Sequence, residues 1–578
     1  MYLDAELKIT KDLTFKTNFG IDIANVRNYN YGSSKQTTAT GSGNGGNGYI
    51  KELSRITENI LTYTKNWDEH RFSATGVYSW QDYVYENLSI SGKGFQNDET
   101  GAWDMGLADR ETMSYASGKY GNTLISFTGR FTYAYKDRYL MTATARYDGS
   151  SRFGTNNKWG FFPSVGLGWR ISEETFLANN KVITNLKLRG SYGITGNQEI
   201  GNYKSLAQLK SKNYIYNDAL MQGFYETIGN PDLKWERTKQ FDLGFDLSLW
   251  NRIHLNVDYY SRRTSDLLYD VPIPSTSGFS TMLSNIGIVS NKGVEIALSG
   301  RIVETKDFKL DATVNISKNK NEIKELYNDV ESITVTSGLG LSKYLKVGES
   351  LLSIYGLKSE GIIKTEEQLA AYQKIVPTAQ LGDEMYADID DDKAITAKDQ
   401  INIGETEPNF FYGVALNLEY KKFHLDILGQ GAHDFAAVGA SNSDMKIGIH
   451  GYGDSFNYLL VGENQTDNRC CLPSKYAYER MWSPSNPNGT FPRAGASNLY
   501  LSDRSNSGWN YFIIKSIALS YDFGNNPIKG IKGIKGISAF VNLQNFITFA
   551  NHRGYNPENG DTSNPWIKTI TIGVNAKF

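Results

Sequence analysis

The stretch from Asp388 to Asp399 holds the residues whose types and spacing come closest to a metal-binding loop. Carboxylates stand at its positions 1, 3, 5 and 12, which are Asp388, Asp390, Asp392 and Asp399, and Thr396 stands at position 9. Ca²⁺ prefers about six to eight oxygen ligands, and an EF-hand loop supplies them from these positions. These five residues are therefore candidate ligands of a Ca²⁺ ion.

Two positions of this stretch depart from the EF-hand pattern. Lys393 stands at position 6, where glycine usually permits a sharp turn, and Asp399 stands at position 12, where a longer glutamate binds through both oxygens. An alternative interpretation is therefore a solvated acidic turn in an extracellular loop, and the sequence leaves both interpretations open.

Aromatic residues in the predicted loops form a second candidate set. A flat apolar ring suits the C–H face of a sugar, so these residues are candidates for glycan binding, although a membrane barrel also uses aromatic residues in its girdles. The candidates are Tyr214, Tyr216, Tyr225, Tyr452, Tyr458 and Trp509.

The sequence gives little support for catalysis, so we predict that the protein is not an enzyme. Its six histidines form no metal-binding cluster, and His254 and His424 are expected to line a lumen from polar strand faces. Cys470 and Cys471 are adjacent, which disfavours a disulfide between them, and we interpret them as loop residues.

The composition narrows the class of protein further. The 578 residues include 60 Lys and Arg against 62 Asp and Glu, which argues against nucleic-acid binding. Glycine and tyrosine are abundant, at 56 and 37 residues, as expected of strands, tight turns and aromatic girdles. Mean hydropathy is low at -0.44, and no apolar run reaches the length of a transmembrane helix. A transmembrane β-barrel remains compatible, because only alternate residues of its strands need be apolar.

Apolar and polar residues alternate along many segments, most regularly at residues 567–578. There Ile570, Ile572 and Val574 share one side with Ala576 and the terminal Phe578. Seventeen segments of this kind are predicted as strands: 1–9, 13–29, 49–65, 70–86, 123–135, 139–148, 159–171, 186–194, 241–249, 253–259, 292–302, 308–317, 411–420, 423–430, 511–522, 537–549 and 567–578.

The connections between these segments alternate between short and long. Long loops are predicted near 30–48, 87–121, 195–237, 263–289 and 432–508, a long stretch with room for extra strands at 320–406, and a helical turn within 172–184. Short periplasmic turns with long extracellular loops are typical of outer-membrane barrels, whereas soluble sandwiches and propellers seldom combine such long strands with such unequal loops. The fold class predicted is all-β, an antiparallel up-and-down transmembrane β-barrel.

The parity of the strands predicts that this barrel is incomplete. Bacterial barrels have an even number of strands with both ends in the periplasm, yet counting back from 567–578 places the start of 1–9 outside the cell. We therefore expect residues 1–578 to be the C-terminal part of a longer barrel. The terminal strand should then pair with 537–549 and have an open edge on its other side.

Several motifs, in order along the chain, resemble those of SusC/RagA-type TonB-dependent outer-membrane transporters. They are Arg146–Gly154, Trp159–Val165, Gly168–Ser172, Leu186–Gly193 with Gly196–Gln198, Asn230–Glu236, Asn291–Glu295, Arg480–Trp482 with Pro492–Arg493, and Gln544–Asn545 with Gly554–Pro557. The resemblance covers the later part of such a barrel, of which about 17 of about 22 strands would be present.

This resemblance implies a location and a set of partners. It implies the outer membrane of a Gram-negative bacterium, import of oligosaccharides, glycans or peptides, a SusD-like surface lipoprotein as a lid, and energy from TonB. It also implies an upstream signal peptide, TonB box and plug domain, none of which is found in these 578 residues, so we expect the chain to be inactive in transport by itself. Two alternatives are a structural or adhesive surface β-protein and a secreted carbohydrate-active enzyme.

Overall fold

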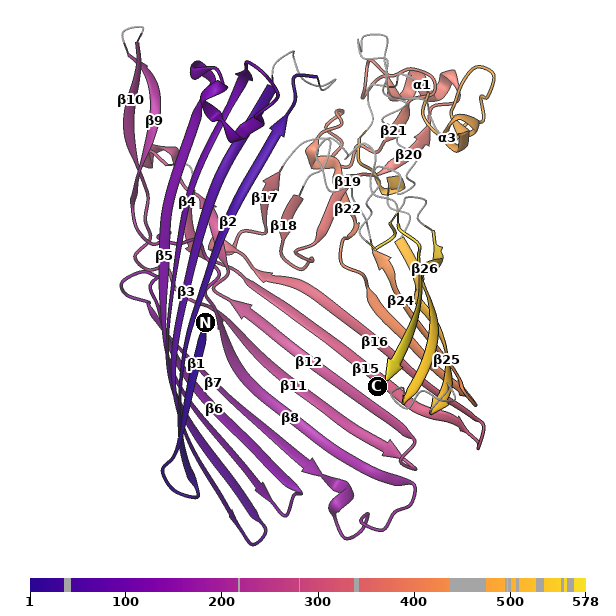
Figure 1. Ribbon diagram of the computed structural model, residues 1–578. Helices are drawn as coiled ribbons and strands as arrows, with labels where there is room; N and C mark the ends of the chain where they lie inside the picture. Colours follow the sequence, from indigo (N-terminus) through magenta and orange to yellow (C-terminus); the bar gives the residue numbers. More distant parts are fainter. Residues whose placement is uncertain are drawn as a thin grey trace. The chain divides into compact units, whose positions relative to one another are not determined.

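The computed structural model consists almost entirely of β-strands and their connections (Figure 1). It describes residues 1–578 except 36–42, 217–218, 280, 337–342, 436–474, 494–495, 497–499, 506–508, 526–534, 552–555, 559–565 and 578. Across the described residues, 17 strands belong to one large sheet. The chain divides into two compact units: unit 1 comprises residues 1–173, 189–241 and 263–287, and unit 2 comprises 174–188, 242–262 and 288–578.

Unit 1 is built on an antiparallel meander in which each strand pairs with the next along the chain. Its strands are β1 (Tyr2–Lys8), β2 (Leu13–Gly32), β3 (Gly43–Trp67), β4 (His70–Phe95), β5 (Ser114–Tyr135), β6 (Tyr139–Ser150) and β7 (Trp159–Arg170). It also contains two ribbons, β9 (Gln208–Tyr216) with β10 (Ala219–Thr227), and β13 (Leu268–Pro272) with β14 (Thr281–Asn285). Both units contain residues of β8 (Ile183–Asn197), β11 (Glu236–Leu249) and β12 (Ile253–Ser265).

Unit 2 contains a second antiparallel meander. Its strands are β15 (Ile288–Glu304), β16 (Phe308–Glu325), β23 (Phe410–Tyr420), β24 (Phe423–Phe435), β25 (Trp509–Asn525), β26 (Gly536–Ala550) and β27 (Thr569–Lys577). These pairings confirm the predicted succession of strands from 292–302 to the end of the chain.

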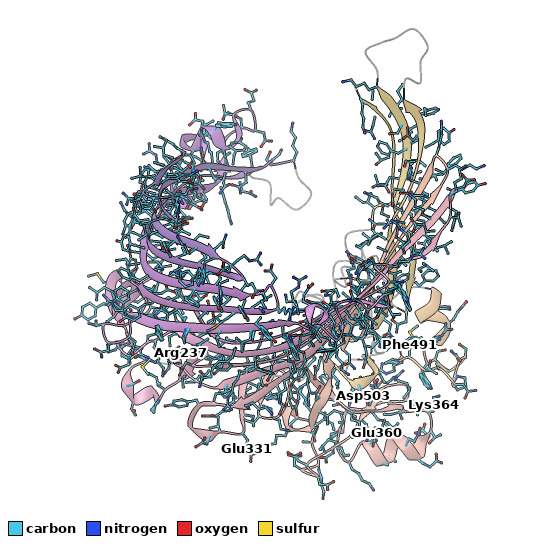
Figure 2. All side chains as sticks on the ribbon, turned by 90° about the horizontal axis from the view of Figure 1, so that it is seen from below. Arg237, Glu331, Glu360, Lys364, Phe491 and Asp503 are labelled. Carbon is cyan, nitrogen blue, oxygen red and sulfur yellow. The ribbon has the colours of Figure 1, made fainter. Side chains whose placement is uncertain are left out.

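The described parts of the long connections of unit 2 form a small lobe, which we call the insert lobe (the described residues of 326–406 and 475–505). Its elements are β17 (Ser332–Thr336), β18 (Lys343–Lys346), β19 (Ser353–Leu357), β20 (Ser359–Ile362), α1 (Glu366–Tyr372), β21 (Glu384–Tyr386), β22 (Gln400–Glu405) and α3 (Lys475–Arg480). Figure 2 shows Glu360 and Lys364 beside Phe491 and Asp503, and the backbone amide of Ser359 donates to Asp503. The lobe thus joins segments more than a hundred residues apart in the sequence.

Two adjacent acids hold these segments of the insert lobe together. The carboxylate of Asp383 accepts a hydrogen bond from Arg493 Nε at 2.7 Å. The carboxylate oxygen Oε1 of Glu384 lies 3.4 Å from Arg504 Nη1. Both carboxylates are buried, so neither could be left without its partner except at a large cost in stability. The motif residue Trp482 packs on Gly382, where an added Cβ would lie 2.2 Å from the indole ring.

The terminal strand has the two faces that its sequence predicts. β27 pairs with β26, and the register places Ile570 opposite Leu543 and Ile572 opposite Val541. The side chains of Ile570, Ile572 and Val574 are 58, 78 and 68% exposed, as expected of residues that face lipid. Phe578 lies outside the described residues, and the open outer edge of this strand stays a prediction.

The structure corrects several predicted loops near the start of the chain. The Gly-rich residues 43–48 belong to β3, β4 continues to Phe95, and β5 begins at Ser114, so the loop predicted at 87–121 is much shorter. Glycine suits β3 here because a Cβ at Gly45 would lie 2.8 Å from Ala102, in the 3₁₀ turn Gly101–Trp103. Backbone pairing and this packing outweigh the low strand propensity of glycine.

Two further predicted loops contain strands. The segment 195–237 includes β9 and β10, and 263–289 includes β13 and β14. A 3₁₀ turn at Ile171–Glu173 opens the connection where a helical turn was predicted. Within the described part of the chain, no helix is long and apolar enough to cross a membrane.

Candidate binding site

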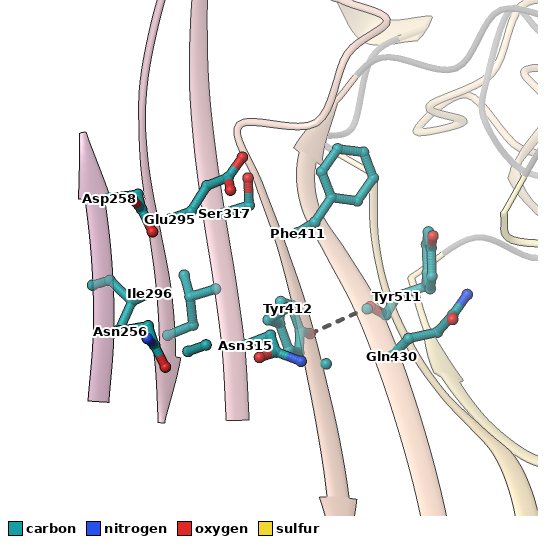
Figure 3. Close-up of a pocket in the computed structure, with 14 residues that line it drawn as sticks. Asn256, Asp258, Glu295, Ile296, Asn315, Ser317, Phe411, Tyr412, Gln430 and Tyr511 are labelled. Carbon is teal, nitrogen blue, oxygen red and sulfur yellow. Dashed lines mark hydrogen bonds between the residues drawn. The ribbon is translucent and has the colours of Figure 1, made fainter. Parts of the chain in front are cut away.

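A hollow of about 460 Å³ lies in unit 2, lined by residues of strands β12, β15, β16, β23, β24 and β25 (Figure 3). Its lining mixes polar and apolar side chains. The polar ones are Asn256, Asp258, Glu295, Asn315, Ser317 and Gln430, and the others include Ile296, Ala297, Ile316, Phe411, Tyr412 and Tyr511.

The strand register explains why the polar residues share one face. Glu295 pairs with Ser317, and Ser317 in turn pairs with Phe411. One step along the strands, Asn315 pairs with Gly413, which pairs with Gln430. Directly paired residues of antiparallel strands point to the same side, so the polar positions of successive strands form one polar face.

The hollow offers a mixture of groups suited to a hydroxylated or peptide ligand. The carboxylates of Asp258 and Glu295 accept hydrogen bonds, whereas the amides of Asn315 and Gln430 both donate and accept. Phe411 is 47% exposed, so its ring can contact the apolar part of a ligand. This combination of a few polar groups with an aromatic surface is characteristic of small-molecule sites.

A close approach of two strands lies next to the hollow. The hydroxyl of Tyr412 donates to the carbonyl oxygen of Tyr511 at 3.3 Å (Figure 3). Its ring passes over Gly431, where an added Cβ would lie 2.5 Å from Tyr412 Cζ. Glycine at this position therefore permits the contact between β23 and β25.

A later segment of the chain is tied to the strand ends beside this hollow. Gln430 Nε2 donates to Glu558, and Lys515 Nζ lies 2.7 Å from the same carboxylate. Lys515 also lies 4.2 Å from the ring centroid of Trp566, which packs against the buried cluster of Phe435, Tyr511 and Ile513. Gln430 is thereby held in place at the hollow.

The acidic stretch predicted to bind Ca²⁺ forms a compact turn in the insert lobe. Oxygen atoms of Asp388, Asp390 and Asp392 lie within 4.8 Å of one another. Lys393 adopts a φ of 64°, the left-handed conformation for which the EF-hand uses glycine. Asp388 Oδ1 is buried without a hydrogen-bond partner, and such an atom suits a cation. These three carboxylates fit a Ca²⁺ ion.

The other two predicted ligands have structural roles in the same turn. Asp399 is fully buried, and its carboxylate accepts hydrogen bonds from the backbone amides of Ile389 and Thr396, each at 2.7 Å. The hydroxyl of Thr396 accepts from the amide of Lys398. The structure therefore brings together three of the five predicted residues as a carboxylate group, while Asp399 and Thr396 hold the turn that carries them.

The remaining predicted residues are dispersed. Tyr216 is 69% exposed on the β9–β10 ribbon, to which Tyr214 and Tyr225 also belong, and Trp509 begins β25. His254 Nδ1 lies 2.9 Å from Ser248 Oγ, and His424 pairs across the strands with Glu419, both on polar faces as predicted. Tyr452, Tyr458, Cys470 and Cys471 lie outside the described residues.

Sequence reasoning missed Phe411 as a site residue. A signal was present, because Phe411 occupies a polar-face position in a strand whose next such positions are Gly413, Ala415, Asn417 and Glu419. An isolated aromatic residue on that face is a better indication of a binding surface than aromatic residues in loops.

Comparison with known proteins decides the family. The family model described as "TonB dependent receptor-like, beta-barrel" matches residues 3–344. The chain belongs to this family. TonB-dependent receptor P3 of Formosa agariphila is 32% identical over 98% of this chain and 56% of its own length. TonB-dependent receptor SusC of Bacteroides thetaiotaomicron is 28% identical over 95% of this chain and 53% of its own length.

Solved structures agree with the SusC/RagA-type resemblance. The structure described as the RagAB peptide transporter superposes with a TM-score of 0.82 at 25% identity, covering 100% of this chain and 61% of that one. The chain of this TonB-dependent receptor spans a little over half the length of the curated relatives it matches.

Membership of the family gives the two strand faces their environments. TonB-dependent receptors are outer-membrane β-barrels, in which apolar residues meet lipid and the alternate residues face an aqueous interior. The apolar face that contains Ile572 is therefore the lipid face, and the face that carries Glu295, Ser317 and Phe411 is the interior face. The family is one of receptors rather than of enzymes.

Proposed function

We propose that the whole protein to which this chain belongs imports oligosaccharides, glycans or peptides across the outer membrane, with energy supplied through TonB. Its family and its similarity to SusC and to the RagAB peptide transporter support this proposal. A SusD-like surface lipoprotein is the proposed partner, because the SusC/RagA-type relatives suggest a receptor that works with a second component.

The observation that best supports a role in substrate passage is the hollow on the interior face of unit 2. It combines carboxylates at Asp258 and Glu295, amides at Asn315 and Gln430, and the exposed ring of Phe411. Hydroxyl and amide groups of an oligosaccharide or peptide would find donors and acceptors there, and the ring would cover an apolar part of the ligand.

Uptake by whole cells tests this proposal. Labelled oligosaccharides and peptides are offered to cells that produce the whole protein and to cells that lack its gene, with and without collapse of the proton-motive force. We expect uptake of at least one of these compounds to require both the gene and the proton-motive force. Equal uptake of every compound by both strains would contradict the proposal.

We also propose that Ca²⁺ binds the turn formed by Asp388, Asp390 and Asp392. The clustering of their oxygens and the unpartnered Oδ1 of Asp388 support this ligand. Lys398 Nζ lies 3.7 Å from Asp390 and 4.0 Å from Asp392, so it partly neutralises the carboxylates and would have to move aside when the ion binds. A bound ion would stabilise the insert lobe rather than take part in transport.

A further inference from the structure

A second hollow, of about 370 Å³, lies in unit 2 where the end of β16 meets the insert lobe. Small-molecule sites usually have volumes of about 300–1,000 Å³, so this hollow is large enough for a ligand. Charged side chains of both signs line it, and we call it the mixed-charge hollow. These side chains are Lys318, Lys320, Glu405, Glu407 and Asp434.

Strand pairing brings these side chains together from distant parts of the sequence. Both lysines belong to β16, Glu405 ends β22, and Asp434 lies near the end of β24. Glu407 lies in the short connection between β22 and β23. Phe410, the first residue of β23, pairs with Lys318 of β16 on one side and with β24 on the other. The ends of β16 and β24 therefore flank the connection that leads into β23.

Hydrogen bonds to neighbouring side chains hold two of the carboxylates in place. Glu407 Oε1 accepts from the side-chain amide of Asn319 at 3.3 Å, and the oxygen of that amide accepts from the hydroxyl of Tyr260 at 3.1 Å. Asp434 Oδ2 accepts from the side-chain amide of Asn409 at 3.4 Å. Because ordering side chains on binding costs free energy, groups that already have fixed positions favour the binding of a ligand.

The opposite charges line the same hollow without pairing directly with one another. Across the residues that the structure describes, no ion pair within 4.0 Å joins a lysine of the hollow to one of its acids. Lys320 Nζ instead lies 3.8 Å from Glu322, which is outside the lining. Partial burial, followed by the nearby Glu407, raises the pKa of Glu405 above its ordinary value of 4.5, and Lys320 opposes this shift without cancelling it. The acids of the hollow are therefore not neutralised by its lysines.

The charges of the hollow restrict the chemistry of its ligand. A neutral ligand would displace water from charged groups without supplying an opposite charge, which is costly. A ligand with charge of one sign would be attracted by one part of the lining and repelled by the other. A zwitterion can direct its ammonium group to the three carboxylates and its carboxylate to the two lysines, so that charge-assisted hydrogen bonds form at both ends.

We propose that the mixed-charge hollow binds a short peptide whose amino and carboxyl ends are both free and charged. The ammonium group of the peptide would meet the three carboxylates, and its terminal carboxylate would meet the two lysines. Its backbone amides would form hydrogen bonds with Asn319 and Asn409, which also line the hollow. This inference rests on the proposed import function, within which it names peptides rather than neutral oligosaccharides as the substrate class.

Calorimetric binding of four forms of trialanine to the whole protein in detergent tests this proposal. The four forms have both ends free, only the amino end acetylated, only the carboxyl end amidated, or both ends blocked. We expect each blocked end to raise the dissociation constant about tenfold, because the charge-assisted hydrogen bonds of that end are lost. Equal binding of all four forms would overturn the proposal, and this comparison requires no variant of the protein.

Two variants assign each end of the peptide to its part of the hollow. Glu405→Gln should weaken binding of the free peptide about fivefold and leave binding of the acetylated form unchanged. Lys318→Gln should likewise weaken binding of the free peptide and leave binding of the amidated form unchanged. The matched controls are Glu360→Gln and Lys358→Gln, which replace exposed residues of the insert lobe outside the hollow. Equal weakening of the free and the blocked forms by either variant, or equal effects of the controls, would contradict the assignment.

The binding measurement distinguishes this inference from the proposed import function, because binding in detergent does not depend on transport. If trialanine binds as expected but cells show no energy-dependent uptake of peptides, the binding site is confirmed and the import of peptides is contradicted. If cells import only neutral oligosaccharides and all four forms of trialanine bind equally, this inference is overturned and the import function stands.

Discussion

The hydroxyl of Tyr412 donates a hydrogen bond to the carbonyl oxygen of Tyr511 at 3.3 Å, across the backbone of Gly431. An added Cβ at Gly431 would lie 2.5 Å from the ring of Tyr412 and 2.5 Å from that same carbonyl oxygen. The bond therefore depends on the absence of a side chain on the strand between the two tyrosines. Residues from all three strands line the hollow.

Gly431→Ala is expected to destabilise the strands that line the hollow. The added methyl must displace Tyr412 or shift the backbone, at a cost of about 1–3 kcal/mol in the free energy of unfolding. Gly413→Ala is the matched control, because its Cβ would lie 3.8 Å from the nearest atom, the carbonyl oxygen of Gly429. Thermal unfolding in detergent measures the loss of stability of both variants. Equal losses for the two variants would show that the Tyr412 contact is unimportant.

Asp388→Asn is expected to abolish Ca²⁺ binding at the turn in the insert lobe. The substitution removes a carboxylate from the group of three and leaves the turn otherwise intact. Asp391→Asn is the control, since Asp391 lies in the same turn but outside that group, and asparagine tolerates its φ of 56°. Calorimetric titration with Ca²⁺ measures the difference. An unchanged trace for Asp388→Asn would refute the site.

Glu384 is expected to make the stability of the insert lobe depend on pH. Burial raises the pKa of this carboxyl above its ordinary value of 4.5, although Arg504 and the hydroxyls of Ser359 and Tyr386 act in the opposite direction. The nearby Asp503 raises the pKa further. A raised pKa means that the folded lobe binds the proton more tightly than the unfolded chain, so this contribution is complete below about pH 4.5 and is lost as pH rises through the raised value.

Glu384→Gln should remove this pH dependence, because glutamine does not titrate. Hydrogen exchange of the lobe's amides, corrected for the intrinsic exchange rate at each pH, measures the local stability. We expect the unmodified lobe to lose protection as pH rises above about 4.5 and the variant to show a flatter profile. A parallel profile for both proteins would show that another group is responsible.

Much of the strand architecture could be predicted from the sequence because alternation requires no knowledge of distant residues. Ile570, Ile572 and Val574 reveal the lipid face of β27 from a stretch of a few residues, and the same pattern gave the seventeen strands. The ribbons β9–β10 and β13–β14 were missed because apolar and polar residues do not alternate regularly along them. Without that alternation, the pattern does not distinguish a strand from a loop.

The candidate sites depended more on distant contacts and were predicted less completely. The spacing of Asp388, Asp390 and Asp392 indicated a group of carboxylates. It could not show that the carboxylate of Asp399 accepts hydrogen bonds from backbone amides instead of joining this group. The hollow gathers Glu295, Phe411 and Gln430 from three strands. These residues are close together because β16 pairs with β23. The insert lobe separates these two strands in the sequence, so the pairing could not be seen in a local pattern.

The most direct test of this account is the affinity of the whole protein for an oligosaccharide or peptide of the kind we propose that it imports, when Phe411 is replaced by alanine. Phe411 is 47% exposed on the interior face, and Phe423 is 45% exposed on the lipid face. Calorimetry should show a dissociation constant about tenfold higher for Phe411→Ala and nearly unchanged for Phe423→Ala. An unchanged constant for Phe411→Ala, or equal losses for both variants, would contradict the assignment of the interior hollow as a substrate-binding surface.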